Sequence, residues 1–140
     1  MKKIKIFSLF LFLTVCFSCE ENGLIADCSN CTVEEPEMAT LIVKLKDIGI
    51  PVRVNIYEGE LEDSILYDFT DSNVSEYNPA VKLNKRYSLT ATYYIDGNTY
   101  VAIDAVTPKV KYTKDQCDEP CYYVYDRVAD LRLKYTANGD

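Results

Sequence analysis

The chain has 140 residues, a net charge of −7 at pH 7 and no histidine, and its length suits a single domain. The acidic balance and the lack of a basic cluster argue against a nucleic-acid partner, because such partners are held by Lys and Arg that displace counterions. The absence of histidine removes the commonest general base and the commonest metal ligand, which argues against an enzyme.

The first 18 residues have the composition of an export signal. Lys2, Lys3 and Lys5 precede a nearly unbroken apolar run over residues 6–17. This run is too short to cross a bilayer as a helix, and acidic residues follow it closely. We therefore expect residues 1–18 to be a signal peptide.

The end of this signal resembles the lipobox of bacterial lipoproteins, in which the cysteine after the cut is lipidated. Ser18 precedes Cys19, although Cys16 stands where Leu is usual. The resemblance implies that acyl chains such as palmitate on Cys19 anchor the protein to a membrane, since each buried CH₂ contributes about 0.8 kcal/mol. Secretion with an unmodified Cys19 is the alternative. Glu20 and Glu21 resemble the surface-export signal of lipoproteins from the Bacteroidota, which implies an outer-membrane location and favours display at the cell surface.

Residues 19–37 are predicted to form an acidic tether that ends near Pro36 and contains Cys28 and Cys31. From Met38 onward, apolar and polar residues alternate with a period of two, which is typical of half-buried strands. The first two strands are expected around 41–45 and 52–57, with a hairpin-like turn at 47–49.

The clearest predicted unit is a hairpin over residues 87–105. Asp96 and Gly97 interrupt two alternating runs, and these residue types tolerate the positive φ angles of tight loops. If Ile95 and Thr99 share a face, the loop has three residues, 96–98. Val101 and Ile103 would then point to the same side as Ile95.

Shorter strands are expected at 65–69, 80–83 and 122–125, and a last strand contains Leu131 and Leu133. No segment after the signal sustains a helical period. Seven to eight strands in about 100 residues predict an all-β fold, a single antiparallel immunoglobulin-like sandwich over residues 38–137.

The segments GIPVRVNIYEG, YDFTDSN and LNKRYSLTATY, in that order, resemble the carboxypeptidase-regulatory-like and transthyretin-like sandwich modules. The resemblance covers about Leu41 to Tyr94, and departs where Asn73 replaces a glycine and in the cysteine-bearing last third. It implies a non-catalytic binding or spacer module. The chain as a whole resembles small lipoproteins that are common in Bacteroidota.

Four cysteines remain outside the signal and the lipid site: Cys28, Cys31, Cys117 and Cys121. Export to an oxidising compartment predicts disulfides, although four cysteines allow three connectivities. In immunoglobulin-like sandwiches the first and last strands often run side by side and parallel, which would bring both cysteine pairs to one end. This favours cross-links between the pairs over two local rings.

Two other cysteine chemistries are alternatives. The C-x₂-C and C-x₃-C spacings could form a four-cysteine zinc site, and Cys28 with Cys31 could form a thioredoxin-like dithiol. The dithiol would need a helix N-terminus to lower its thiol pKa, whereas the surrounding sequence is acidic and has no helical period.

Three further groups of residues are candidate sites. Asp68, Asp71, Asn73 and Glu76 could offer oxygens to calcium, but a solvated turn is the favoured interpretation. Ser64 lies in an Asp-Ser-Ile sequence that resembles the O-glycosylation sequon of Bacteroidota.

Tyr94 and Tyr100 flank the predicted hairpin loop and are expected on one outer face. There they could stack on a glycan or anchor a protein partner; the alternative is ordinary packing within the sheet.

Taken together, the sequence predicts a non-enzymatic, lipid-anchored lipoprotein of the outer membrane or cell surface. Its sandwich would act as a binding or structural accessory module, with no cofactor and no resident metal. The alternative is an exported protein whose cysteines bind zinc or carry out redox chemistry.

Overall fold

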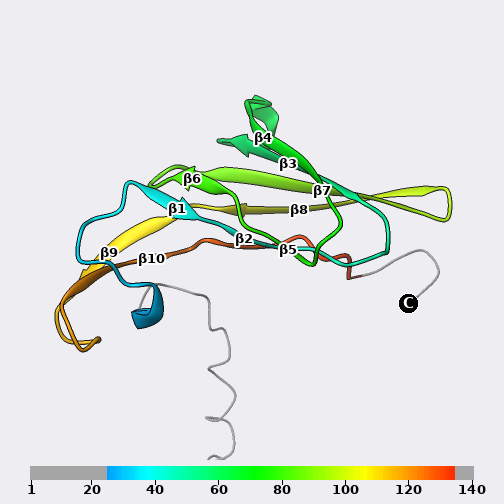
Figure 1. Cartoon of the computed structure of the whole chain (residues 1–140). Coiled ribbons are helices and arrows are strands. Elements are labelled where there is room, and N and C mark those ends of the chain that lie inside the picture. Colours follow the sequence, from blue (N-terminus) through cyan, green and yellow to red (C-terminus); the bar gives the residue numbers. More distant parts are fainter. Residues whose placement is uncertain (1–24, 135–140) are drawn as a thin grey trace, which may run out of the picture.

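The computed structural model describes residues 25–134. The expected signal peptide, the lipid-site candidate Cys19 and the last three residues of the predicted domain lie outside this range. The described part is an all-β sandwich, as predicted (Figure 1). It contains two short 3-10 helices, η1 (Cys28–Asn30) and η2 (Leu61–Asp63). Within residues 25–134, no helix is long and apolar enough to span a membrane.

One layer is a four-stranded antiparallel sheet. Its strands are β3 (Val52–Glu58), β4 (Leu66–Ser72), β7 (Tyr87–Ile95) and β8 (Asn98–Val106), in the order β4-β3-β7-β8. In Figure 1 the β7–β8 hairpin extends well beyond the other strands, so its turn forms one end of the molecule.

The second layer is made of short strands that pair in two groups. They are β1 (Met38–Thr40), β2 (Ile42–Lys44), β5 (Glu76–Tyr77), β6 (Ala80–Lys82) and β11 (Val128–Asp130). β1 pairs with β6, whereas β2 lies between β5 and β11. The pairing of β2 with β11 is parallel, which confirms the expectation that the first and last strands of the sandwich run side by side.

A separate hairpin of β9 (Lys109–Thr113) and β10 (Cys121–Tyr125) extends from the end of the sandwich opposite the β7–β8 turn (Figure 1). The sequence did not predict β9, because its two lysines surround a single aliphatic residue, Val110. The strand forms through its five-residue pairing with β10, from Thr113 opposite Cys121 to Lys109 opposite Tyr125.

The core lies between the two layers. The four-stranded sheet contributes the buried side chains of Val52, Val54, Ile56, Tyr87, Leu89, Ala91, Tyr93 and Val106. The second layer and its flanking residues contribute Ala39, Leu41, Val43, Leu45, Val81, Ala129 and Leu131. In β3 every second residue is therefore buried, as the alternating pattern predicted. In β7 the predicted core face is buried, but Ser88 and Thr90 on the opposite face are buried as well.

The strand expected around 41–45 is β2, which is preceded by the separate strand β1, and the described residues form eleven strand segments rather than seven or eight. Leu41 separates β1 from β2, and the two segments pair with different partners. The predicted hairpin turn at 47–49 is also not a hairpin, because β2 and β3 do not pair. Gly49, at φ +75°, instead lies in a connection between the two layers.

The predicted three-residue loop of the β7–β8 hairpin is wrong. Ile95 pairs with Asn98, which leaves a two-residue turn of Asp96 and Gly97 with φ angles of +49° and +78°. Two positive φ angles are typical of the type I′ turn, whose twist matches that of paired strands. Shortening the loop by one residue reverses the faces of β8. Val101 and Ile103 are consequently exposed rather than buried.

Candidate functional site

Two disulfides join the segment before β1 to the β9–β10 hairpin. Cys28 is bonded to Cys117 and Cys31 to Cys121, and the Cα atoms of each pair are 5.6 Å apart. The expected cross-link between the two cysteine pairs is therefore confirmed, and local rings are not formed. The Cys31–Cys121 bond is the less exposed of the two, since Cys121 is buried and Cys28 is exposed.

Backbone contacts reinforce this attachment. The N–H of Thr32 donates to the carbonyl of Tyr122 at 2.8 Å, and the N–H of Tyr122 donates to the carbonyl of Thr32 at 2.7 Å. Nearer the N-terminus, the N–H of Ala26 donates to Oε1 of Gln116 at 2.6 Å. The described part of the expected tether is therefore docked on the hairpin, and Ala26 is buried.

The sulfur atoms of Cys31, Cys117 and Cys121 all lie within 4.8 Å of one another. If both disulfides were reduced, these thiols would already be gathered at one place. The thioredoxin-like arrangement is less well supported, because Cys28 begins a 3-10 helix of three residues and not a longer helix that could lower its pKa. The N-cap of that helix is Asp27, an acidic residue.

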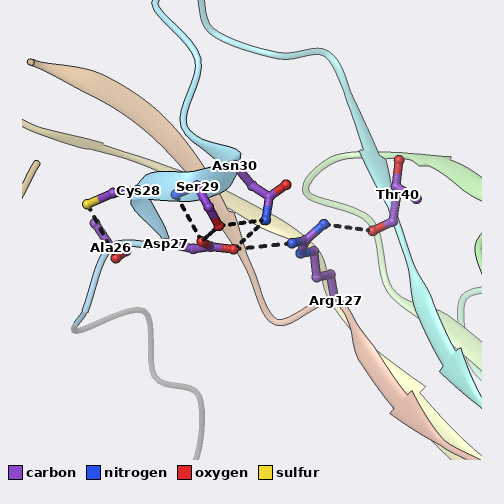
Figure 2. Close-up of polar contacts among 7 residues, drawn as sticks. All are labelled: Ala26, Asp27, Cys28, Ser29, Asn30, Thr40 and Arg127. Carbon is purple, nitrogen blue, oxygen red and sulfur yellow. Dashed lines mark hydrogen bonds and ion pairs between the residues drawn. The ribbon is translucent and has the colours of Figure 1, made fainter.

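Asp27 organises the turn between the two disulfide-forming cysteines of this segment (Figure 2). Its Oδ1 accepts hydrogen bonds from the Ser29 hydroxyl at 2.6 Å and the Ser29 N–H at 3.2 Å, and its Oδ2 accepts from the Asn30 amide at 2.7 Å. These bonds lower the pKa of the Asp27 carboxyl. The hydrogen bond from the Ser29 hydroxyl has the largest effect, the one from Asn30 has the next largest, and the charge of Arg127 has the smallest.

Arg127 lies between this turn and β1. One terminal nitrogen donates to Asp27 Oδ2 at 3.5 Å, and the other donates to the carbonyl of Thr40 at 3.4 Å (Figure 2). The side chain of Arg127 is only 17% exposed. In the other four ion pairs of the described residues, the cationic side chains are 42–54% exposed and the N–O distances are 2.5–2.8 Å. The most buried of these cations therefore has the longest ion pair.

Arg127 also lines a cavity of about 210 Å³ beside the docked segment. The other polar residues of its wall are Asn30, Thr32 and Thr40. The apolar residues of its wall are Pro36, Met38, Ala39 and Val124. The sequence did not indicate this cavity, because its walls come from residues 30–40 and 124–127, which no local pattern connects.

The two candidate ligand-contact tyrosines lie on opposite faces of the β7–β8 hairpin, which corrects the expectation of a shared face. Tyr94 is 56% exposed on the outer face. Tyr100 is half-buried, pairs with the buried Tyr93 and packs against the core. Asp104 lies on the same inner side of β8 as Tyr100. Its carboxylate accepts the N–H of Asp130 at 2.8 Å, which attaches β8 to β11.

The outer face of the four-stranded sheet instead exposes three other apolar side chains. Phe69 of β4, with Val101 and Ile103 of β8, is more than half exposed. Arg53 of β3 lies over the Phe69 ring, with its guanidinium carbon 5.1 Å from the ring centre. This face therefore combines apolar contact area with a cation.

The candidate calcium ligands are not gathered at one site. Asp68 and Asp71 lie in β4, whereas Glu76 lies in β5. Asp71 forms an ion pair with Arg53 at 2.6 Å, and Asp68 accepts a hydrogen bond from Tyr77 at 3.1 Å. The expected turn at 71–73 is in part strand, because β4 continues to Ser72.

The glycosylation candidate Ser64 is exposed and ends η2 in the left-handed conformation, with φ +54°. Its hydroxyl is directed back toward the carbonyl of Leu61 at 3.5 Å. The residue therefore lies on an accessible turn.

Family models, curated proteins and solved structures show no match to this chain.

Proposed function

We propose that this protein is a lipid-anchored lipoprotein of the outer membrane, and that its sandwich is a non-enzymatic binding or structural accessory module. The observation that supports this proposal most is the pair of disulfides that attach the segment after Cys19 to the β9–β10 hairpin. Disulfides of this kind persist in exported proteins.

The attachment would also orient the module. Cys28 lies nine positions after Cys19 in the sequence, and a fully extended chain over nine positions spans about 30 Å. A lipid on Cys19 would thus hold the disulfide-bonded end near the membrane surface. The turn of the β7–β8 hairpin lies at the far end of the molecule from η1 (Figure 1), so Tyr94 would be directed away from the membrane.

Membrane fractionation tests the anchor. Cys19→Ala should move the protein from the membrane fraction to the soluble fraction, and Cys16→Ala should leave it in the membrane because Cys16 lies within the signal. Retention of the Cys19→Ala variant after an alkaline wash would contradict lipid anchoring.

Replacement of both Glu20 and Glu21 by alanine tests display at the cell surface. This variant should keep the anchor but be cleaved less by protease added to intact cells.

The outer face of the four-stranded sheet is the surface that we propose for a glycan or protein partner. Tyr94, Phe69 and Ile103 supply exposed apolar area there. In a glycan array and a pull-down, Tyr94→Ala should reduce capture of the glycan or protein partner. Tyr100→Ala, which removes the half-buried tyrosine that pairs with Tyr93, is the comparison variant. Equal capture by wild type and Tyr94→Ala would assign Tyr94 to sheet packing alone.

The second candidate is a zinc-binding or redox-active exported protein, which the grouping of three cysteine sulfur atoms within 4.8 Å favours. Its test is the number of free thiols in the protein as exported. Four alkylatable cysteines and one bound zinc ion would favour this candidate over a disulfide-bonded module.

A further inference from the structure

We infer that the cavity beside Arg127 binds a small monocarboxylate with an apolar body, either a free organic acid or the C-terminal carboxylate of a peptide. This inference goes beyond the proposed anchor, since it holds whether or not Cys19 is lipidated. It also gives the sandwich a defined ligand, in addition to any partner of the outer sheet face.

Arg127 is incompletely paired within the described residues. A guanidinium carries five N–H donors, and among the described residues only two hydrogen bonds use them, at 3.4 and 3.5 Å. Both lie beyond the roughly 2.7–2.9 Å that is typical of charge-assisted hydrogen bonds. A charge that is largely removed from water is costly unless it is closely paired. Arg127 therefore lacks the close anion that its burial calls for.

The nearby carboxylate does not supply that anion. Asp27 is held by Ser29 and Asn30 at 2.6–3.2 Å, and Arg127 contributes least to its lowered pKa. Asp27 is thus positioned by its own turn and lies 3.5 Å from the guanidinium. The remaining N–H donors of Arg127 have no hydrogen-bond acceptor among residues 25–134, and an arginine can bind another carboxylate through two parallel hydrogen bonds.

The cavity is small, and its wall combines polar and apolar residues. Arg127 lines a space of about 210 Å³, below the roughly 300–1,000 Å³ of sites for drug-sized ligands. Met38, Pro36 and Val124 offer apolar contact, and Thr32 and Asn30 offer polar atoms. Polar and apolar residues contribute equally to this wall, four of each, and small-molecule sites use such polar groups to orient a ligand beside apolar contacts.

The charges at the cavity limit the net charge of a ligand that fits there. Within the cavity wall Arg127 is the single charged side chain among the residues described, and the Asp27 carboxylate lies next to it. The chain as a whole is negative, at −7. Asp27 repels a dianion such as phosphate about twice as strongly as a monocarboxylate at the same distance, because the Coulomb energy scales with the charge. One negative charge and a compact apolar body fit this arrangement best.

The test is an amide-shift NMR titration of the full exported protein with both disulfides intact. The probes are benzoate and hexanoate, which represent free acids, and N-acetyl-leucine, which represents a peptide C-terminus. Each is compared with its neutral primary amide, and inorganic phosphate is the dianion control. At least one acid should shift the amides of Thr40 and Val124, with an affinity at least tenfold higher than that of its amide and of phosphate.

Variants locate the site. Arg127→Gln should weaken acid binding at least tenfold, and Arg53→Gln, a matched loss of an arginine on the other layer, should leave it unchanged. Asp27→Asn keeps an N-cap residue of similar quality but removes the competing charge, so it should tighten acid binding severalfold. If Arg127→Gln does not fold, Met38→Trp, at an exposed position that lines the cavity, should block the cavity and abolish binding.

The inference is overturned if no acid shifts these amides, if acids and amides bind equally, or if Arg127→Gln binds as wild type does. None of these outcomes depends on Cys19, so they can be told apart from a failure of the anchor.

Discussion

Tyr93 shows how a single polar atom connects the layers of this sandwich. Its ring is buried, and its hydroxyl donates to the carbonyl of Leu131 at 2.7 Å and accepts the N–H of Lys46 at 3.1 Å. Burial raises the pKa of Tyr93, so the hydroxyl stays protonated over the ordinary pH range. One phenol thus satisfies two backbone groups that no strand pairing reaches.

Removing this hydroxyl should therefore be costly. Tyr93→Phe leaves both backbone groups without their partner, and we expect the free energy of unfolding to fall by about 1–3 kcal/mol. Urea denaturation measures the change. The adjacent Tyr94 is exposed, so Tyr94→Phe should alter stability by less than about 0.5 kcal/mol. Equal effects of the two variants would contradict the role assigned to the Tyr93 hydroxyl.

Asp130 makes stability depend on pH in the acid range. The hydrogen bond from Arg132 is the largest cause that lowers its pKa from 3.8 to about 2. Because the folded-state pKa lies below the unfolded one, the stabilisation is complete above about pH 4 and is lost as the pH falls toward about 2. Asp130→Asn should therefore lose less stability than wild type between pH 4 and pH 2.

Urea midpoints measured across this range test the Asp130 prediction. Asp118→Asn, at an exposed position in the β9–β10 connection, is the control for a loss of one acid. Parallel wild-type and Asp130→Asn curves between pH 4 and pH 2 would contradict the prediction.

At the scale of the elements, the β7–β8 turn depends on residues that accept positive φ angles. Nothing lies within 4 Å of a Cβ placed on Gly97, so the cost of Gly97→Ala comes from its φ of +78° alone. We expect a loss of about 1 kcal/mol in the free energy of unfolding. Gly97→Asn should cost less, because asparagine tolerates this conformation better. A neutral Gly97→Ala would argue against the two-residue turn.

The alternating pattern predicted β3, β7 and the core face of each, since burial on one side imposes a period of two. It could not predict which side of β8 is buried, because that depends on a loop one residue shorter than expected. The inward position of Asp104 illustrates the reason. In a sequence, an aspartate is normally assigned to the surface, but the Asp104 carboxylate accepts the N–H of Asp130 on β11.

The candidate sites were predictable to different degrees. The cross-linking of the two cysteine pairs followed from the expected parallel first and last strands, which place the residues before each of them at one end. The sequence did not predict which of the two possible cross-linked connectivities forms. The cavity at Arg127 could not be predicted, because the docking of residues 25–37 on β10 creates it. No sequence pattern near Arg127 distinguishes it from a surface arginine.

At the scale of the whole molecule, the two disulfides close nearly the same loop. They span 89 and 90 residues. In the chain-entropy model the first cross-link over such a loop contributes about 4–5 kcal/mol, and the second, which closes only short segments, adds about 2–3 kcal/mol. When one disulfide is removed, the other therefore still supplies most of the stabilisation that the two give together.

This redundancy predicts non-additive losses. Replacing Cys28 and Cys117 by serine, or Cys31 and Cys121 by serine, should each lower the free energy of unfolding by about 2–3 kcal/mol, and replacing all four should lower it by about 7 kcal/mol. Chemical denaturation of the three variants gives the values. A fourfold variant whose loss equals the sum of the two double variants would contradict the shared-loop account.

We propose a membrane-anchored module whose N-terminal segment is fixed by two disulfides. Its most direct test is the intact mass of the protein extracted from membranes, denatured without reductant and treated with an alkylating reagent. We predict a chain that begins at Cys19, carries the added mass of acyl chains and gains no alkyl groups. A chain without acyl mass, or one that gains four alkyl groups, would contradict the claim.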